Sequence, residues 1–361
     1  MGLAGALETR MRAAQYRAGS MAKVGWFGAF YVLGRHIVGP LTKPGEAPTP
    51  LRSGLPASSD MQREFSQVFR DEWDDIRAGV YKFPREFRER PNPLRAVRNV
   101  RDYIEEARAV SARANRKGGG VEVREDAPDD LPNYYRQNFH FQTDGWLSDR
   151  SAQVYETQVE VLFTGAAGAM RRRALPLIMD EVRRLKAEGR ASADIQFADV
   201  ACGTAPLLSD IVDNDPDLAI SAVDLSAPYL ERAKKSAKGA RNIRFIEAAA
   251  EKLPFEDNSL DILTTVYLFH ELPPKVRREV AKEFARVLKP GGLYVHLDSV
   301  QYGDTSMDLL LETFPMAFHE PYYDSYCQED LAALFSEVGL LPDGERLGFL
   351  SKASGFRAGC S

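Results

Sequence analysis

The sequence has few cysteines, no excess of basic charge and no long apolar run. Its three cysteines, Cys202, Cys327 and Cys360, are widely separated. They form neither a disulfide framework nor a metal cluster, so a cytoplasmic location is expected. The formal net charge of -5 argues against a nucleic-acid partner, because nucleic-acid-binding domains are usually strongly basic. The apolar run of residues 24–33 is about half of the length that a membrane span requires.

The composition is that of a folded protein. Hydrophobic residues make up 44% of the chain and charged residues 27%, which is ordinary globular usage and not that of a disordered protein. The 361 residues are enough for one large or two modest domains, each with its own core.

Residues 195–208 have the pattern of the first unit of a doubly wound α/β sheet. A short run of strand formers ends at Asp199, small residues follow at positions 201–203, and a helix is expected after Thr204. Ligands of such sheets bind at the carboxyl ends of the strands. Small side chains let a ligand approach the turn, and the helix N-terminus offers unpaired N–H groups.

A second expected strand, residues 219–223, ends in Asp224. A carboxylate about twenty residues after the turn, at the tip of the second strand, can accept hydrogen bonds from both hydroxyls of a ribose. The alternative is that Asp224 is a helix-capping acid, although Ser226 also suits that position. The spacing favours the ribose interpretation.

Three motifs resemble those of the class I S-adenosylmethionine-dependent methyltransferases, in the family's order along residues 170–357. Residues 199–205 (Asp-Val-Ala-Cys-Gly-Thr-Ala) resemble the first motif, Asp-x-Gly-x-Gly-x-Gly, with alanine at two of the three glycines. Residues 250–261 resemble the third signature, and residues 286–292 resemble the turn before the fifth strand. Because alanine resists positive φ, the first turn is expected either to be slightly reshaped or to keep negative φ at the two alanines.

The resemblance implies a fold, a domain organisation and a cofactor. The fold is α/β: a doubly wound, mostly parallel seven-stranded Rossmann-like sheet with an antiparallel edge strand, preceded by a helical N-terminal extension. Residues 1–60 are expected to be an arm and linker, residues 61–168 a helical extension and lid over the active site, and residues 169–361 the cofactor-binding domain. The cofactor is S-adenosylmethionine, its product is S-adenosylhomocysteine, and no metal is expected.

The cofactor-binding residues that the resemblance implies lie at the carboxyl ends of the strands. They are Asp199, Ala201, Cys202, Gly203, Thr204, Asp224, Leu225, Ala250, Glu251 and Tyr267. Ala249 stands where many members of the family have an acid that binds the adenine amino group. Adenine is therefore expected to be held by backbone groups and apolar contacts, with Leu225 as a wall.

His270 and His140 are the candidate catalytic residues. His270 follows the fourth expected strand, residues 261–269, and an imidazole that titrates near neutral pH suits a general base. The alternative is that His270 only packs against the cofactor or bonds a backbone carbonyl. A base, whether His270, His140 or His319, is required only if the acceptor must lose a proton.

Two irregular segments, residues 132–149 and 314–326, combine aromatic and polar residues. Such segments commonly line small-molecule pockets, although the first is equally suited to hold the N-terminal helices to the sheet. The residues predicted to contact the acceptor are Tyr135, Trp146, Tyr155, Asp298, His319 and Tyr322.

The arm of residues 1–41 is open to two interpretations. Basic residues flank an aromatic-rich stretch, which suits an interfacial helix that contacts a membrane peripherally. The other interpretation is a hydrophobic arm docked on the protein. A signal peptide is less favoured than either, because no clear cleavage site follows.

The predicted function is methyl transfer from S-adenosylmethionine to a small, lipophilic or aromatic acceptor, as in quinone-biosynthesis-type methyltransferases. A dinucleotide-dependent oxidoreductase would need a G-x-G-x-x-G fingerprint, which is absent. The second alternative is a non-catalytic scaffold with the same fold, favoured by Ala201, Ala205 and Ala249. Asp199, Asp224 and Glu251 argue against it, since a fold without a ligand has no need of these acids.

Overall fold

The computed structural model describes residues 3–38, 54, 56–89, 93–115, 120–124 and 127–359. Nearly all of the expected linker, residues 40–56, lies outside the described residues, as does Cys360.

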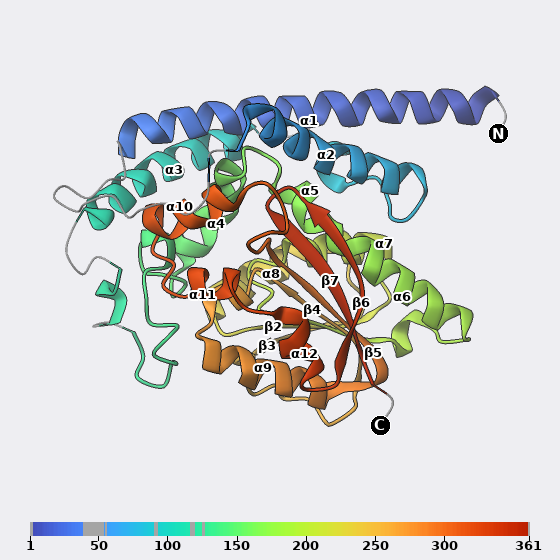
Figure 1. Cartoon of the computed structure of the whole chain (residues 1–361). Coiled ribbons are helices and arrows are strands. Elements are labelled where there is room, and N and C mark those ends of the chain that lie inside the picture. Colours follow the sequence, from blue (N-terminus) through green and yellow to red (C-terminus); the bar gives the residue numbers. More distant parts are fainter. Residues whose placement is uncertain are drawn as a thin grey trace.

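A seven-stranded sheet forms the centre of the protein (Figure 1). Its strands are β1 (Gln196–Val200), β2 (Ala219–Asp224), β3 (Ile243–Glu247), β4 (Leu260–Val266), β5 (Leu288–Ser299), β6 (Leu340–Gly348) and β7 (Ser351–Ala358). They follow the order β3-β2-β1-β4-β5-β7-β6. The pairs from β3 to β5 are parallel, and β7 is antiparallel to both of its neighbours. The predicted α/β fold class is confirmed.

Two details of the sheet differ from the prediction. The antiparallel strand β7 lies one position inside the edge, because the tight turn at residues 349–350 folds it back between β6 and β5. The expected turn at residues 289–292 is part of β5, which begins directly after helix α9 (Pro274–Val287) and pairs irregularly with β4 at its start. Gly291, at a φ of 78°, accommodates this irregular stretch.

Helices cover both faces of the sheet because the central strands β1, β2, β4 and β5 are buried on both sides. On one face, alternate strand residues such as Phe197 and Ile262 pack with helices α6 (Leu175–Ala187), α7 (Pro206–Asn214) and α8 (Ala227–Ser236). On the other, residues such as Ala198 and Leu263 pack with α9, α11 (Tyr323–Cys327) and α12 (Leu331–Ser336). Helices α5 (Ala167–Arg171) and α10 (Asp308–Ala317) precede α6 and α11.

The N-terminal region is a separate layer of helices. Its members are α1 (Leu3–Val38), α2 (Ser58–Arg77), α3 (Pro93–Ala114) and α4 (Asp149–Leu162). The long helix α1 contacts α2, α3 and α4 along its length (Figure 1), and Tyr16 and Phe30 are buried there. Met21 and Trp26 are exposed. The arm is thus docked along one side, and a membrane contact of its exposed side stays a prediction.

None of the described helices combines the length and the apolar character needed to cross a membrane.

A buried ionic cluster ties this helical layer to the sheet domain. The Arg172 guanidinium, which follows α5, pairs with Glu72 of α2, with Glu86 at 2.6 Å and with Asp210 of α7 at 3.5 Å. Tyr16 of α1 donates a hydrogen bond to the same Glu72 carboxylate. One guanidinium therefore neutralises acids from several segments that are far apart in the sequence.

We expect Arg172→Met to lower the free energy of unfolding by about 3–5 kcal/mol, because Glu72 would remain buried without its cation. Urea denaturation followed by circular dichroism measures the loss. Arg241, whose pair with Asp217 is exposed, is the control, and Arg241→Met is expected to change the value by less than about 1 kcal/mol. Equal losses in the two variants would show that the cluster does not connect the layers.

Candidate functional site

A cavity opens at the carboxyl ends of β1, β2 and β4. These three strands are parallel neighbours, so their carboxyl ends meet at one edge of the sheet and the loops that follow them converge. The cavity has an empty volume of about 770 Å³, its opening to solvent included. Its lining includes six predicted cofactor-binding residues: Ala201, Gly203, Asp224, Leu225, Ala250 and Tyr267.

The turn after β1 has a left-handed backbone. Ala201, Gly203 and Ala205 have φ values of 57°, 56° and 60°. The turn is tight because the Ala205 N–H donates to the Cys202 carbonyl at 2.8 Å, while the Cys202 N–H donates to Val223 of β2 at 3.0 Å. The expectation that the alanines keep negative φ is therefore wrong. These bonds impose a conformation that costs a non-glycine residue about 1–2 kcal/mol.

Asp224 joins this turn to the end of β2. Its carboxylate accepts hydrogen bonds from the backbone N–H groups of Gly203 and Ser226, each at 2.8 Å. Helix α8 is capped by Ser226, whose hydroxyl accepts from the Tyr229 N–H. Burial raises the pKa of Asp224 to about 6, although the backbone N–H groups lower it. Asp224 is thus a buried acceptor at the wall of the cavity.

The other four predicted cofactor-binding residues are not in the lining. Asp199 is buried behind the turn and accepts a hydrogen bond from the Thr264 hydroxyl at 2.9 Å, and burial raises its pKa to about 7. Cys202 is also buried. The Thr204 hydroxyl donates to Glu156 at 2.7 Å. The Glu251 carboxylate accepts from the Tyr134 hydroxyl at 2.8 and 2.9 Å.

Aromatic side chains form much of the cavity wall. Tyr135, Trp146 and Tyr155, which were predicted to contact the acceptor, line it together with Tyr134 and Tyr229. The sequence prediction missed the last two, although Tyr134 lies in the predicted aromatic segment.

The segment of residues 132–149 is also bonded to the sheet domain. Its Tyr134 hydroxyl bonds Glu251, and the Trp146 carbonyl accepts from the Ser226 hydroxyl at 2.5 Å. The indole of Trp146 stacks on Phe139 with ring centroids 4.2 Å apart. This segment therefore both lines the cavity and holds the layers together, as the two interpretations proposed. Its role as a lid stays a prediction.

The remaining predicted acceptor residues lie outside the lining. Asp298 pairs with His270, with 2.5 Å between Oδ1 and Nδ1. The Nε2 atom of His319 is 2.9 Å from Gln137 Oε1, and the Tyr322 hydroxyl accepts from Gln137 Nε2 at 3.1 Å. Both residues therefore hold the segment before α11 to the segment of residues 132–149.

The two candidate catalytic histidines have opposite electrostatic environments. Burial by itself lowers the pKa of His270, but the carboxylates of Asp298 and Glu271 raise it well above its usual range. Burial lowers the pKa of His140 to about 4 against the attraction of Glu271. At neutral pH, His270 is therefore a cation, whereas His140 is a neutral imidazole that can accept a proton. A catalytic role for either stays a prediction.

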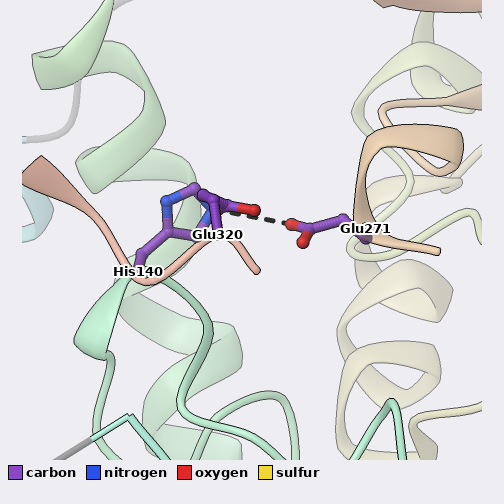
Figure 2. Close-up of side chains that lie close together, drawn as sticks. All are labelled: His140, Glu271 and Glu320. Carbon is purple, nitrogen blue, oxygen red and sulfur yellow. Dashed lines mark ion pairs between the residues drawn. The ribbon is translucent and has the colours of Figure 1, made fainter. Parts of the chain in front are cut away.

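Glu271 is the residue that connects these histidines to the cavity. It lies in the 3₁₀ helix after β4, Phe269–Glu271, and lines the cavity. Figure 2 shows His140, Glu271 and Glu320 pointing toward one another from three separate segments. The Nε2 atom of His140 is 3.0 Å from Glu320 Oε1 and 3.7 Å from Glu271 Oε1. The sequence prediction gave no role to Glu320.

We expect Ala201→Gly to raise the free energy of unfolding by about 0.5–1 kcal/mol. Glycine removes the strain of the left-handed conformation, and its greater freedom in the unfolded chain offsets only part of the gain. Urea denaturation measures the change. Ala285→Gly, within helix α9, is the control and is expected to lower stability by about 1 kcal/mol. A loss of stability in Ala201→Gly would contradict the strained turn.

We expect Asp199→Asn to stabilise the ligand-free protein increasingly as the pH rises. The pKa of Asp199 is raised from 3.8 to about 7, so the folded state binds more protons than the unfolded state between these values. The native protein, which has this carboxyl, therefore loses stability as the pH rises from about 4 to about 7, by a total on the order of 4 kcal/mol. The variant has no carboxyl at this position and does not undergo this loss. Urea denaturation of the variant and the native protein at pH 5 and pH 8 measures this difference.

The exposed Asp180 provides the control for this titration, because its side chain is 63% exposed. Asp180→Asn is expected to give nearly the same difference from the native protein at both pH values. If Asp199→Asn also differs from the native protein by the same unfolding free energy at pH 5 and pH 8, folding does not change the ionisation of the Asp199 carboxyl between these pH values.

Comparisons with known proteins point to one family. Residues 197–292 match the family described as methyltransferase domain. A ubiquinone/menaquinone biosynthesis C-methyltransferase from Campylobacter jejuni is 32% identical over 157 residues, which are 42% of this chain and 61% of the relative. A demethylmenaquinone methyltransferase from Staphylococcus saprophyticus is 34% identical over 122 residues, 33% of this chain and 51% of the relative. The chain thus spans between half and two thirds of these relatives.

Among solved structures, a SAM-dependent methyltransferase from Aquifex aeolicus has 19% sequence identity and a TM-score of 0.36, covering 49% of this chain and 89% of that protein. The motifs, the match of residues 197–292 and the curated relatives all indicate the same kind of domain. The chain contains a class I S-adenosylmethionine-dependent methyltransferase domain, distantly similar to the ubiquinone and menaquinone methyltransferases.

Proposed function

We propose that the protein transfers a methyl group from S-adenosylmethionine to a small lipophilic or aromatic acceptor. The observation that carries this proposal is the cavity at the strand ends, where the small-residue turn and the buried Asp224 carboxylate lie opposite aromatic side chains. Such a cavity combines polar groups that orient a ligand with apolar walls.

The residues present fit the methyl donor. The Asp224 carboxylate accepts two backbone hydrogen bonds, and its remaining lone pairs can accept from ribose hydroxyls. Leu225 and the three alanines at positions 248–250 provide an apolar lining for the adenine. At Ala249, where many family members have an acid, backbone groups would have to bind the adenine amino group.

The bound donor would supply an electrophilic methyl group on a sulfonium. The task of the protein is then to align the acceptor atom with that methyl group and to exclude water, because alignment at about 3–3.5 Å supplies most of the effect. Tyr135, Trp146 and Tyr155 provide flat apolar surfaces for an aromatic or lipophilic acceptor. The quinone-related names of the relatives support a small acceptor of this kind.

A general base is required only if the acceptor loses a proton. His140 is the better candidate, since it is neutral at pH 7 while His270 already carries a proton. His140 contacts Glu271, which lines the cavity. Its position is therefore suited to receive a proton from an acceptor through one intervening group or water.

Calorimetric titration with S-adenosylmethionine and S-adenosylhomocysteine, with NAD as a negative control, tests the proposal. We expect both sulfur compounds to bind and NAD not to bind. Asp224→Ala is expected to weaken binding by at least roughly 10- to 100-fold, because the loss of even one hydrogen bond to a charged acceptor costs about 1.5–3 kcal/mol. Asp217→Ala, at an exposed acid, is the control and should bind as the native protein does.

Circular dichroism must first show that Asp224→Ala is folded, since it leaves two backbone N–H groups without their acceptor. Asp224→Asn retains one acceptor oxygen and provides a second, milder variant. If the folded native protein binds neither sulfur compound, methyl transfer is excluded and the scaffold interpretation replaces it.

A further inference from the structure

The three side chains drawn in Figure 2 converge beside the cavity that is proposed to bind the methyl donor. His140 comes from the segment of residues 132–149, Glu271 follows β4, and Glu320 precedes α11. One ligand atom from each, an imidazole nitrogen and two carboxylate oxygens, lies within 4.8 Å of the other two. Of the three, only Glu271 also lines the cavity, so the cluster lies beside it.

We propose that His140, Glu271 and Glu320 bind a divalent transition-metal cation at the wall of the cavity. Metal–ligand distances of about 2.0–2.2 Å in tetrahedral geometry separate two ligand atoms by about 3.4 Å. The distances from His140 Nε2 to the carboxylate oxygens, 3.0 Å to Glu320 and 3.7 Å to Glu271, lie on either side of this value. Small side-chain rotations would therefore complete the site.

The carboxylate oxygens of this cluster lack hydrogen-bond donors. Both Glu320 oxygens and Glu271 Oε2 are buried and accept no hydrogen bond from any described residue. The Glu320 side chain has no exposed surface, and His140 Nε2 is close to it without hydrogen-bond geometry. Buried carboxylate oxygens are normally satisfied, and a cation at this point would give Glu320 Oε1 the partner that it lacks.

Buried acids gather around the cluster. The carboxyl groups of Glu271, Asp298 and Glu320 are all buried. His270 contacts Glu271 and Asp298, and His140 contacts Glu320. Buried acidic groups normally pair with a cation or coordinate a metal.

The backbone holds the His140 imidazole in this position. His140 and Phe141 have φ values of 55° and 56°, a conformation that is costly for residues other than glycine. The His140 N–H donates to the His319 carbonyl at 3.2 Å, next to Glu320 in the chain. Edge-on contacts with Phe314 and Phe318 restrict the ring further.

The ligand set indicates which cation to expect. Imidazole suits zinc and other transition metals, and carboxylates suit manganese and magnesium. Magnesium keeps most of its water and prefers oxygen ligands, which a site with an imidazole and apolar neighbours does not favour. Zn²⁺ and Mn²⁺ fit better, and three protein ligands leave a position open, as in catalytic zinc sites.

A cation here would lie where an oxygen of the acceptor can complete its coordination, because Glu271 belongs to both the cluster and the cavity wall. This consequence rests on the proposed function, and it would replace His140 as the general base, because a coordinated Nε2 atom has no lone pair left to accept a proton. The binding of the cation does not rest on the proposed function.

Calorimetry on the tag-free, chelator-treated full-length protein tests the site with Zn²⁺, Mn²⁺ and Mg²⁺ as separate titrants. We expect one equivalent of Zn²⁺ or Mn²⁺ per chain and much weaker binding of Mg²⁺. Co²⁺ titration followed by visible absorption reports the coordination geometry independently. The absence of a stoichiometric site for each of these transition metals would overturn the proposal.

Two variants locate the site. Glu320→Gln keeps the shape of the side chain without its charge, and His140→Asn keeps a residue that tolerates positive φ. Each is expected to weaken metal binding roughly 100-fold or more, since the loss of groups that only support metal ligands already weakens it 10- to 100-fold. Glu231→Gln and His36→Asn, at exposed positions, are the matched controls. Affinity unchanged in the first two variants would also overturn the proposal.

Titration of the same preparations with S-adenosylmethionine separates the two proposals. We expect Glu320→Gln to lose metal and still bind the methyl donor, and Asp224→Ala to lose the donor and still bind metal. If the donor binds and no metal does, only the metal site is wrong. If metal binds and the donor does not, only the proposed function is wrong.

Discussion

The parallel pairing of β2, β1 and β4 is the constraint on which the candidate site depends. It places three carboxyl ends side by side, so the turn after β1, the acid at the end of β2 and the 3₁₀ helix after β4 converge on one cavity. The hydrogen bond from the Gly203 N–H to Asp224 joins two of these ends. In the same turn, Ala201 has a left-handed backbone.

The candidate site also depends on parts of the chain outside the sheet. The segment of residues 132–149 crosses the carboxyl edge and contacts both Glu251 and Ser226, while Arg172 holds α2 and the neighbouring helices against the domain. A sheet of this kind leaves its ligand edge open on one side. Residues of the segment before α4 add aromatic side chains to the cavity wall, so under the proposed function this part of the chain, outside the family match, would select the acceptor.

Burial is the first cause of the shifted pKa values of the acids and histidines at the site. Asp199 and Asp224 are both buried, and the pKa of each is raised because desolvation outweighs the hydrogen bonds that it accepts. The pKa of His270 is raised because the carboxylates of Asp298 and Glu271 outweigh its desolvation. The pKa of His140 is lowered because its desolvation outweighs the attraction of Glu271. Two histidines in one cluster thus have opposite protonation at neutral pH, which residue type alone does not indicate.

The sequence by itself determined the alternation of strands and helices along the sheet domain, the turn after β1 and the acid at Asp224, because these depend on local periodicity and short spacings. It could not show that Asp199 and Glu251 lie outside the cavity lining, since their side chains are held by Thr264 and Tyr134, which are distant in the sequence. Only the tertiary structure decided that His140, Glu271 and Glu320 meet. They lie far apart in the chain, and their contact results from the packing of three separate segments against one edge of the sheet.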